Sequence, residues 1–242
     1  MDNRDFMSQQ QAAVADIDVG LRKYMLGVYN QMMLALVITG VVAMGSMMLA
    51  FQGGSLTGFG QAIYVSPLKW VVMLAPLGMV FFLSARVAHM SVSSARIAFY
   101  IFASLMGLSL SSIFIVYTGE SIARVFFITA AAFGGLSLYG YTTKKDLSGI
   151  GTFAIMGLFG IIIASIVNIF VASSALQFMI SVGGVLVFSI LTAYDTQKIK
   201  EMYNEIDGSD VAGKKAIMGA LTLYLDFINL FIMLLQLLGN RD

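Results

Sequence analysis

An aspartate lies in the middle of the last long apolar segment of the chain. Asp226 occurs in the stretch LTLYLDFINLFIMLLQLL. An aspartate at the centre of a membrane helix costs roughly 2.5–3.5 kcal/mol on insertion scales, so such a residue calls for a reason. A single polar stripe with helical spacing runs through it. The other members of the stripe are Gly219, Thr222, Asn229 and Gln236.

The polar stripe has two interpretations. In one, its side chains form a structural hydrogen-bond network that holds helices together. In the other, Asp226 belongs to an ion or proton pathway, with Thr222, Asn229 and Gln236 as lining candidates. In both cases the stripe should face the inside of a bundle or a water-filled path rather than lipid.

A second aspartate, Asp195, lies in the stretch ILTAYDTQKIK at the end of the preceding apolar segment. Alone it is typical of an acid at a helix end. Helices joined by one loop are usually antiparallel neighbours, so Asp195 can approach Asp226. We expect Asp226 about 11 residues into its helix, about 16 Å from the same end. Pairing therefore requires a vertical offset or a tilt.

A pair formed by Asp195 and Asp226 would have a defined chemistry. Two carboxylates that share a site cannot both ionise cheaply, so they titrate as a unit and respond to pH. They also offer hard oxygen ligands for Ca²⁺, which takes six to eight oxygens at about 2.3–2.6 Å. Two aspartates supply at most four of these, so any calcium site would be weak and completed by water or carbonyl groups.

Arg86 ends the second apolar segment, in FFLSARVAHM. One interpretation is a basic anchor at the cytoplasmic end of a membrane helix. The other is a counter-charge that latches one of the aspartates. A latch that opens on protonation or ion binding would act as a gate.

The elements that must position these residues are membrane helices. The 242 residues are 59% hydrophobic and 11% charged, against about 25% charged in soluble domains. Residues 1–26 predict a polar cytoplasmic arm, and residues 27–242 a single all-α multi-pass membrane domain. Its apolar runs are long enough to cross a bilayer as about seven transmembrane helices. They cover approximately 27–50, 68–86, 96–117, 121–142, 150–171, 176–196 and 215–238, and the gap at 197–214 should project into water.

Lysine and arginine in the connections predict the orientation. With the N-terminus in the cytoplasm, the outer side collects only Lys69, Arg124 and Arg241. The inner side then collects Arg4, Arg22, Lys23, Arg86, Arg96, Lys144, Lys145, Lys198, Lys200, Lys214 and Lys215. Seven crossings place the C-terminus outside, whereas a re-entrant last segment would return it inside.

Several function classes have no support in the sequence. Net charge is +1, so there is no basic field for nucleic acid. Cysteine is absent, which excludes zinc–thiolate and iron–sulfur sites. The single histidine, His89, lies in a connection, and no nucleotide-binding glycine loop occurs. We therefore expect no enzyme and no cofactor.

Five stretches together resemble the transmembrane Bax inhibitor motif family. The most specific are TAYDTQKI at 192–199 and LYLDFINLF at 223–231. Supporting stretches are GLSLSSIFIVY at 107–117, YGYTTKKDL at 139–147 and ASIVNIF at 164–170. The resemblance covers nearly all of the chain after residue 25. It implies a fold in which the last helix is central and surrounded by the other six.

The resemblance also implies a function. It suggests a pH-sensitive calcium leak in which Asp195 and Asp226 form the sensor and bind Ca²⁺ weakly, with Arg86 as the gating counter-charge. Some bacterial relatives associate with a membrane-anchored ATP-dependent protease, and eukaryotic relatives act in cell-death pathways. The alternative function is therefore a regulator that transports nothing. We expect a bacterial inner-membrane protein whose partners are the lipid bilayer, Ca²⁺ and protons.

Overall fold

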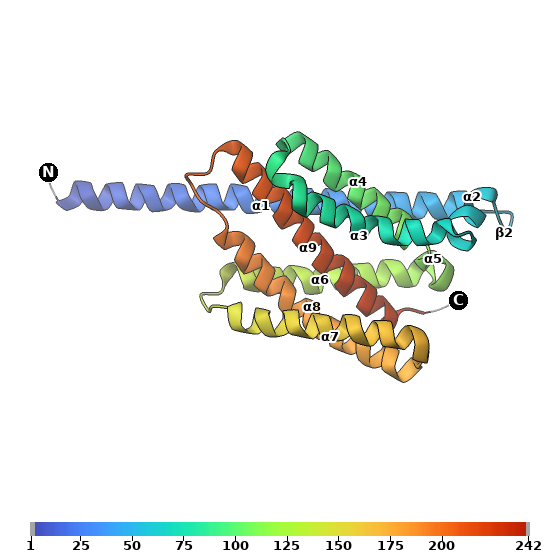
Figure 1. Ribbon diagram of the computed structural model, residues 1–242. Coiled ribbons are helices and arrows are strands. Elements are labelled where there is room, and N and C mark those ends of the chain that lie inside the picture. Colours follow the sequence, from blue (N-terminus) through green and yellow to red (C-terminus); the bar gives the residue numbers. More distant parts are fainter. Residues whose placement is uncertain (1–2, 241–242) are drawn as a thin grey trace.

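The computed structural model describes residues 3–240, and the side chains of residues 19–240. Within this part of the chain, seven helices are long and apolar enough to cross a membrane. This confirms an all-α multi-pass membrane fold (Figure 1). The helices are α1 (Asn3–Ala50), α3 (Leu68–Arg86), α4 (Val92–Leu110) continued by α5 (Ile113–Val116), α6 (Gly119–Thr142), α7 (Ser148–Val171), α8 (Ser174–Glu201) and α9 (Ser209–Leu238).

Helices α1, α8 and α9 are longer than the apolar runs of the sequence that predicted them. The polar arm and the first run form one helix, α1. The sequence predicted a long connection at 197–214. This prediction is wrong, because α8 continues to Glu201 and α9 begins at Ser209. Hydropathy marks the part of a helix that lies in hydrocarbon, whereas the helix itself continues into water. Only residues 202–208 remain as a turn.

The last helix is central, as predicted. α9 is the most buried of the seven spans and packs against α1, α4, α6 and α8. α3 packs on α4, and α7 packs on α8, so these two helices form the outer positions of the bundle. Small residues allow the close approach. A methyl group at Gly219 of α9 would lie 2.9 Å from the side chain of Ile199 of α8.

A short hairpin follows α1 at the far end of the bundle. Strands β1 (Phe51–Gln52) and β2 (Ser55–Leu56) are antiparallel. Gly53 and Gly54 connect them with φ values of 58° and 81°, the left-handed conformations that a two-residue hairpin turn requires. The chain then forms α2 (Gly58–Gly60) and the π-helical turn η1 (Gln61–Val65) before α3.

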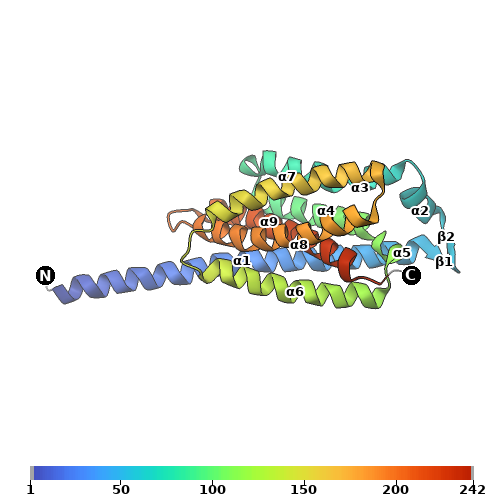
Figure 2. The same cartoon turned by 90° about the horizontal axis from the view of Figure 1, so that it is seen from below.

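The two ends of the described chain lie at opposite ends of the bundle (Figure 1). The first turns of α1 project well beyond the other helices, and the view from below shows the same projection (Figure 2). The α6–α7 and α8–α9 connections lie at the end from which α1 projects, here called the N-terminal side. The hairpin lies at the other end.

Candidate functional site

The register of α8 against α9 positions the two aspartates. Near the N-terminal side, Ile199 packs over Gly219. Near the other side, the Ser181 hydroxyl donates a 2.7 Å hydrogen bond to Gln236 Oε1. A contact at a higher residue number in α8 thus pairs with a lower residue number in α9, so the two helices are antiparallel. This register brings together the two aspartates singled out from the sequence.

The carboxyl groups of Asp195 and Asp226 lie close enough to interact electrostatically. Asp226 is only 5% exposed. Its Oδ2 has no hydrogen-bond partner among the described residues. Asp195 is half-buried and also senses the charge of Lys198. Among the described groups, only Asp195 acts on Asp226 through charge, so the deeper carboxyl has no cationic partner.

The structure removes the geometric difficulty seen in the sequence. Asp195 was expected at the end of its helix, but α8 runs six residues further, to Glu201. These six residues correspond to about 9 Å of helix rise. Asp195 therefore lies deeper than expected and level with Asp226. The polar residues of the stretch QKIK at 197–200 ended the apolar run in the sequence, but their backbone continues α8.

Two residues of the polar stripe bond to their own helix. The Thr222 hydroxyl donates to the carbonyl oxygen of Met218 at 3.1 Å. The Asn229 amide donates to the carbonyl oxygen of Leu225 at 2.8 Å. Both side chains are half-buried, and neither bonds to a neighbouring helix. The stripe is thus present, but these two side chains donate hydrogen bonds to carbonyl oxygens of α9 itself and form no network with each other.

Gln236, the third lining candidate, belongs to a network that joins three helices. Its Oε1 accepts hydrogen bonds from Gln177 Nε2 at 2.9 Å and from Ser181. Gln177 accepts in turn from the Asn168 amide at 3.0 Å. Asn168, Gln177 and Gln236 come from α7, α8 and α9. At this end of the bundle, the contacts favour the structural interpretation of the stripe.

Among the described residues, Arg86 forms no hydrogen bond or ion pair with either aspartate. It is the last residue of α3, its side chain is exposed, and α3 packs on α4 rather than on α9. Among residues 19–240, the ion pair formed is Asp207–Lys215, and Arg86 has no hydrogen-bond or ionic partner there. The structure therefore brings together two of the three groups expected to form the gate.

A hydroxyl network beside Asp195 was missed. The Tyr29 hydroxyl of α1 lies 2.6 Å from the Ser137 hydroxyl of α6. Ser137 lies 2.9 Å from the Thr196 hydroxyl of α8. Thr196 directly follows Asp195, so three helices meet next to the half-buried acid. Single hydroxyl residues are common in membrane helices, and only their spatial convergence distinguishes these.

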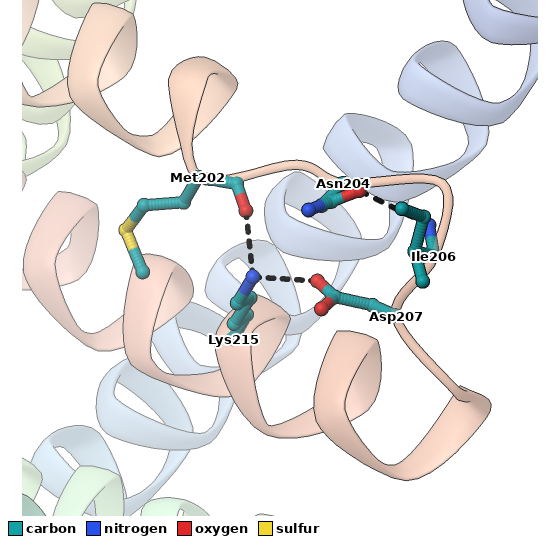
Figure 3. Close-up of polar contacts among 5 residues, drawn as sticks. All are labelled: Met202, Asn204, Ile206, Asp207 and Lys215. Atoms are coloured by element: carbon teal, nitrogen blue, oxygen red, sulfur yellow. Dashed lines mark hydrogen bonds and ion pairs between the residues drawn. The ribbon is translucent and has the colours of Figure 1, made fainter.

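The α8–α9 turn closes the N-terminal side of this interface (Figure 3). The Lys215 ammonium donates to the Met202 carbonyl oxygen at 2.9 Å and to the Asp207 carboxylate at 2.5 Å. Within the turn, Asn204 Oδ1 accepts a 3.1 Å hydrogen bond from the Ile206 amide. A cation of α9 thus fixes the turn that precedes its own helix.

The acidic pair provides hard oxygen ligands but not a complete metal site. Among the described residues, no group of three or more His, Cys, Asp or Glu side chains converges. Two carboxyl groups supply fewer oxygens than the six to eight that Ca²⁺ takes. The remainder would have to come from water or carbonyl groups.

Seven spans, with the last one central and carrying a buried carboxyl, define a multi-pass α-helical membrane protein with an acidic centre. Residues 21–242 match the family described as inhibitor of apoptosis-promoting Bax1. The chain belongs to this Bax inhibitor-1-like family, which confirms the resemblance noted in the sequence.

Bacterial relatives cover almost the whole chain. A Rickettsia prowazekii protein is 48% identical over 93% of this chain and 92% of its own length. The inner membrane protein YbhL of Escherichia coli K12 is 47% identical over 92% of this chain and 93% of its own. A Caulobacter vibrioides protein is 46% identical over 99% and 98%, respectively.

Proposed function

We propose that this protein is a pH-sensitive cation leak that passes Ca²⁺, with Asp195 and Asp226 as its proton- and ion-binding element. The observation that supports it most is the Asp226 carboxyl, 5% exposed, with one oxygen unpartnered and a second carboxyl beside it. An uncompensated buried charge is costly, so the pair needs a shared proton or a bound cation. Either one changes the charge at the α8–α9 contact.

The two acids would act in sequence along the path. Asp195 is half-buried and six residues from the N-terminal-side end of α8, so of the two paired acids it is the first that an entering ion meets. The next residue, Thr196, and its partner Ser137 are candidate sources of further oxygen ligands. Asp226 is the deeper site. A cation bound between the carboxyls would displace their shared proton, which links ion passage to pH.

An apolar cluster supports a closed resting state. Beyond Asp226, the α7–α8–α9 contact is filled by Ala154, Phe188, Leu191 and Leu230, all 5% exposed or less. This cluster lies between the acids and the Gln236 network along α9. A hydrated ion cannot cross packed apolar side chains, so passage requires α8 and α9 to separate locally. Such a requirement suits a slow leak rather than a permanently open pore.

Calcium flux into dye-loaded proteoliposomes tests the proposal. Wild-type protein should admit more calcium than empty liposomes, with a rate that changes between pH 6 and 8. Asp226→Asn removes the deeper charge at nearly constant volume and should reduce the flux several-fold and flatten its pH dependence. Asp210→Asn is the matched control, because Asp210 is exposed in the first turn of α9. Folded wild-type protein that admits no calcium at any pH would rule out a leak.

A regulatory role is the second candidate, favoured by the projection of α1. The first turns of α1 extend past the bundle, where they are accessible to another protein (Figure 1). By resemblance, the partner would be a membrane-anchored ATP-dependent protease. Deletion of residues 3–18 separates the two functions. A leak should persist after the deletion, whereas a regulator should lose its partner in a pull-down from membranes.

We also propose a location in a bacterial inner membrane with the N-terminal side in the cytoplasm, from the basic residues at that side and the likeness to YbhL. The chain has no cysteine, so an introduced one is unique. Ile206→Cys, in the α8–α9 turn, should resist a membrane-impermeant thiol reagent in intact cells. Gly53→Cys, in the hairpin, should react. The opposite pattern would invert the orientation.

A further inference from the structure

A long groove separates α1 from α6. Both helices pack on α9, and Phe227 of α9 contributes to the groove lining between them. The groove has a volume of about 1440 Å³. Typical small-molecule pockets have volumes of about 300–1,000 Å³, so a larger ligand fits here. The groove follows α1 from Arg22 to Met48, about 39 Å of helix rise, which exceeds the roughly 30 Å hydrocarbon core of a bilayer.

The walls of this groove are apolar and lie at membrane depth. On α1, Met33, Val37 and Met44 are at least half exposed, and on α6 Phe127 and Leu138 are more exposed still. In a bilayer these side chains meet hydrocarbon rather than water. The occupant must therefore be largely apolar.

Glycines keep the groove wide. A methyl group added at Gly40, Gly45 or Gly134 would meet no atom within 4 Å. All three glycines line the groove. By contrast, a methyl group at Gly107 of α4 would meet the backbone of α1 at 2.5 Å. Gly107 serves close packing, whereas the groove glycines leave space that no part of the chain fills.

The two ends of the groove differ in polarity. The end near the N-terminal side is lined by Arg22, Tyr29, Ser137 and Tyr141, and among the side chains of residues 19–240 Arg22 is the only charged one in the lining. The Lys200 ammonium adds a second positive charge there, because it donates to the Tyr141 carbonyl oxygen at 2.8 Å and lies 5.4 Å from its ring centroid.

Among the described residues, no polar side chain lines the opposite end. Its lining residues include Met44, Met48, Phe114 and Ile122. A ligand with an anionic head and a long apolar tail therefore matches the groove in one orientation only.

We propose that the groove binds an anionic phospholipid of the leaflet on the N-terminal side. The phosphate would lie at Arg22, on the side to which Lys200 adds its positive charge, and the acyl chains would run along the methionine and glycine wall. Basic pockets between membrane helices bind lipid head groups in this way.

Native mass spectrometry of the purified full chain tests the proposal. Phosphatidylglycerol and phosphatidylethanolamine with identical acyl chains are added in parallel. Wild type should retain phosphatidylglycerol several-fold more than phosphatidylethanolamine. Gly134→Leu fills the groove and should reduce bound phosphatidylglycerol several-fold. Gly135→Leu is the matched control, because Gly135 is adjacent, equally open and outside the lining, so it should bind as wild type does.

The charged end is tested in the same way. Arg22→Gln should abolish the preference for phosphatidylglycerol. Both Arg22→Gln and Gly134→Leu should keep the wild-type unfolding temperature. Lys23→Gln is its control, since Lys23 is exposed and does not line the groove. Equal retention of the two lipids by wild type, or equal effects of Gly134→Leu and Gly135→Leu, would overturn the proposal. A dimer that Gly134→Leu dissociates would assign the groove to a second copy instead.

Discussion

The hydroxyl of Tyr224 on α9 lies 2.6 Å from the hydroxyl of Thr39 on α1. Thr39 donates its own proton to the Ala103 carbonyl oxygen of α4 at 2.9 Å, so Tyr224 is the donor to Thr39. Both side chains are buried, Tyr224 completely. Three helices are thus joined by two consecutive hydrogen bonds, about 3 Å of helix rise from the level of Asp226.

Tyr224→Phe should destabilise the fold by about 1–2 kcal/mol, because Thr39 loses its donor inside the bundle while the ring contacts remain. Denaturant titration of the purified protein measures the change. Tyr139→Phe is the control, since Tyr139 is 49% exposed and should change little. Equal stability of wild type and Tyr224→Phe would show that the hydrogen bond is not formed in the membrane.

Gly140→Ala on α6 should displace Asp195 by pushing on the backbone of α8. A methyl group at Gly140 of α6 would overlap the carbonyl oxygen of Ala193, two residues before Asp195. Since backbone cannot move aside cheaply, we expect a destabilisation of roughly 1–3 kcal/mol and a displaced Asp195. Unfolding temperature and calcium flux report the two effects. Gly135→Ala has open space and should match wild type in both.

Leu230→Ala should increase the leak. Leu230 is 1% exposed in the apolar cluster beyond Asp226, and its truncation opens a cavity on the path between the acids and the Gln236 network. A folded variant should show faster calcium entry than wild type. Leu74→Ala is the control, because Leu74 is exposed on α3. An unchanged or slower flux in folded Leu230→Ala would remove this cluster from the path.

Hydropathy predicted the seven spans because bilayer thickness sets their length, and the intramembrane position of Asp226 predicted a buried polar face. The same pattern failed at the end of α8, because polar residues such as Lys198 and Lys200 continue a helix into water. The sequence allowed Arg86 to act as a counter-charge of the gate, but α3 packs on α4, and Arg86 makes no contact with the acids among the described residues. One-dimensional spacing carries no information about which helices are neighbours.

Other features depended on tertiary contacts or on weak local signals. Tyr29, Ser137 and Thr196 converge from three helices, and no local pattern links them. The hairpin was detectable in principle, because Gly53-Gly54 is a two-residue turn signal. It was overlooked because the flanking strands have only two residues each.

The central claim, that Asp195 and Asp226 act as one proton- and ion-sensitive unit, is tested most directly by a two-by-two set of asparagine variants. Calcium flux into proteoliposomes is measured at pH 6 and pH 8 for wild type, Asp195→Asn, Asp226→Asn and the double variant. Groups that share one proton are not additive, so we predict that each single change flattens the pH dependence and that the double change adds little. Independent, additive effects of the two substitutions, or a pH dependence that survives in the double variant, would contradict the account.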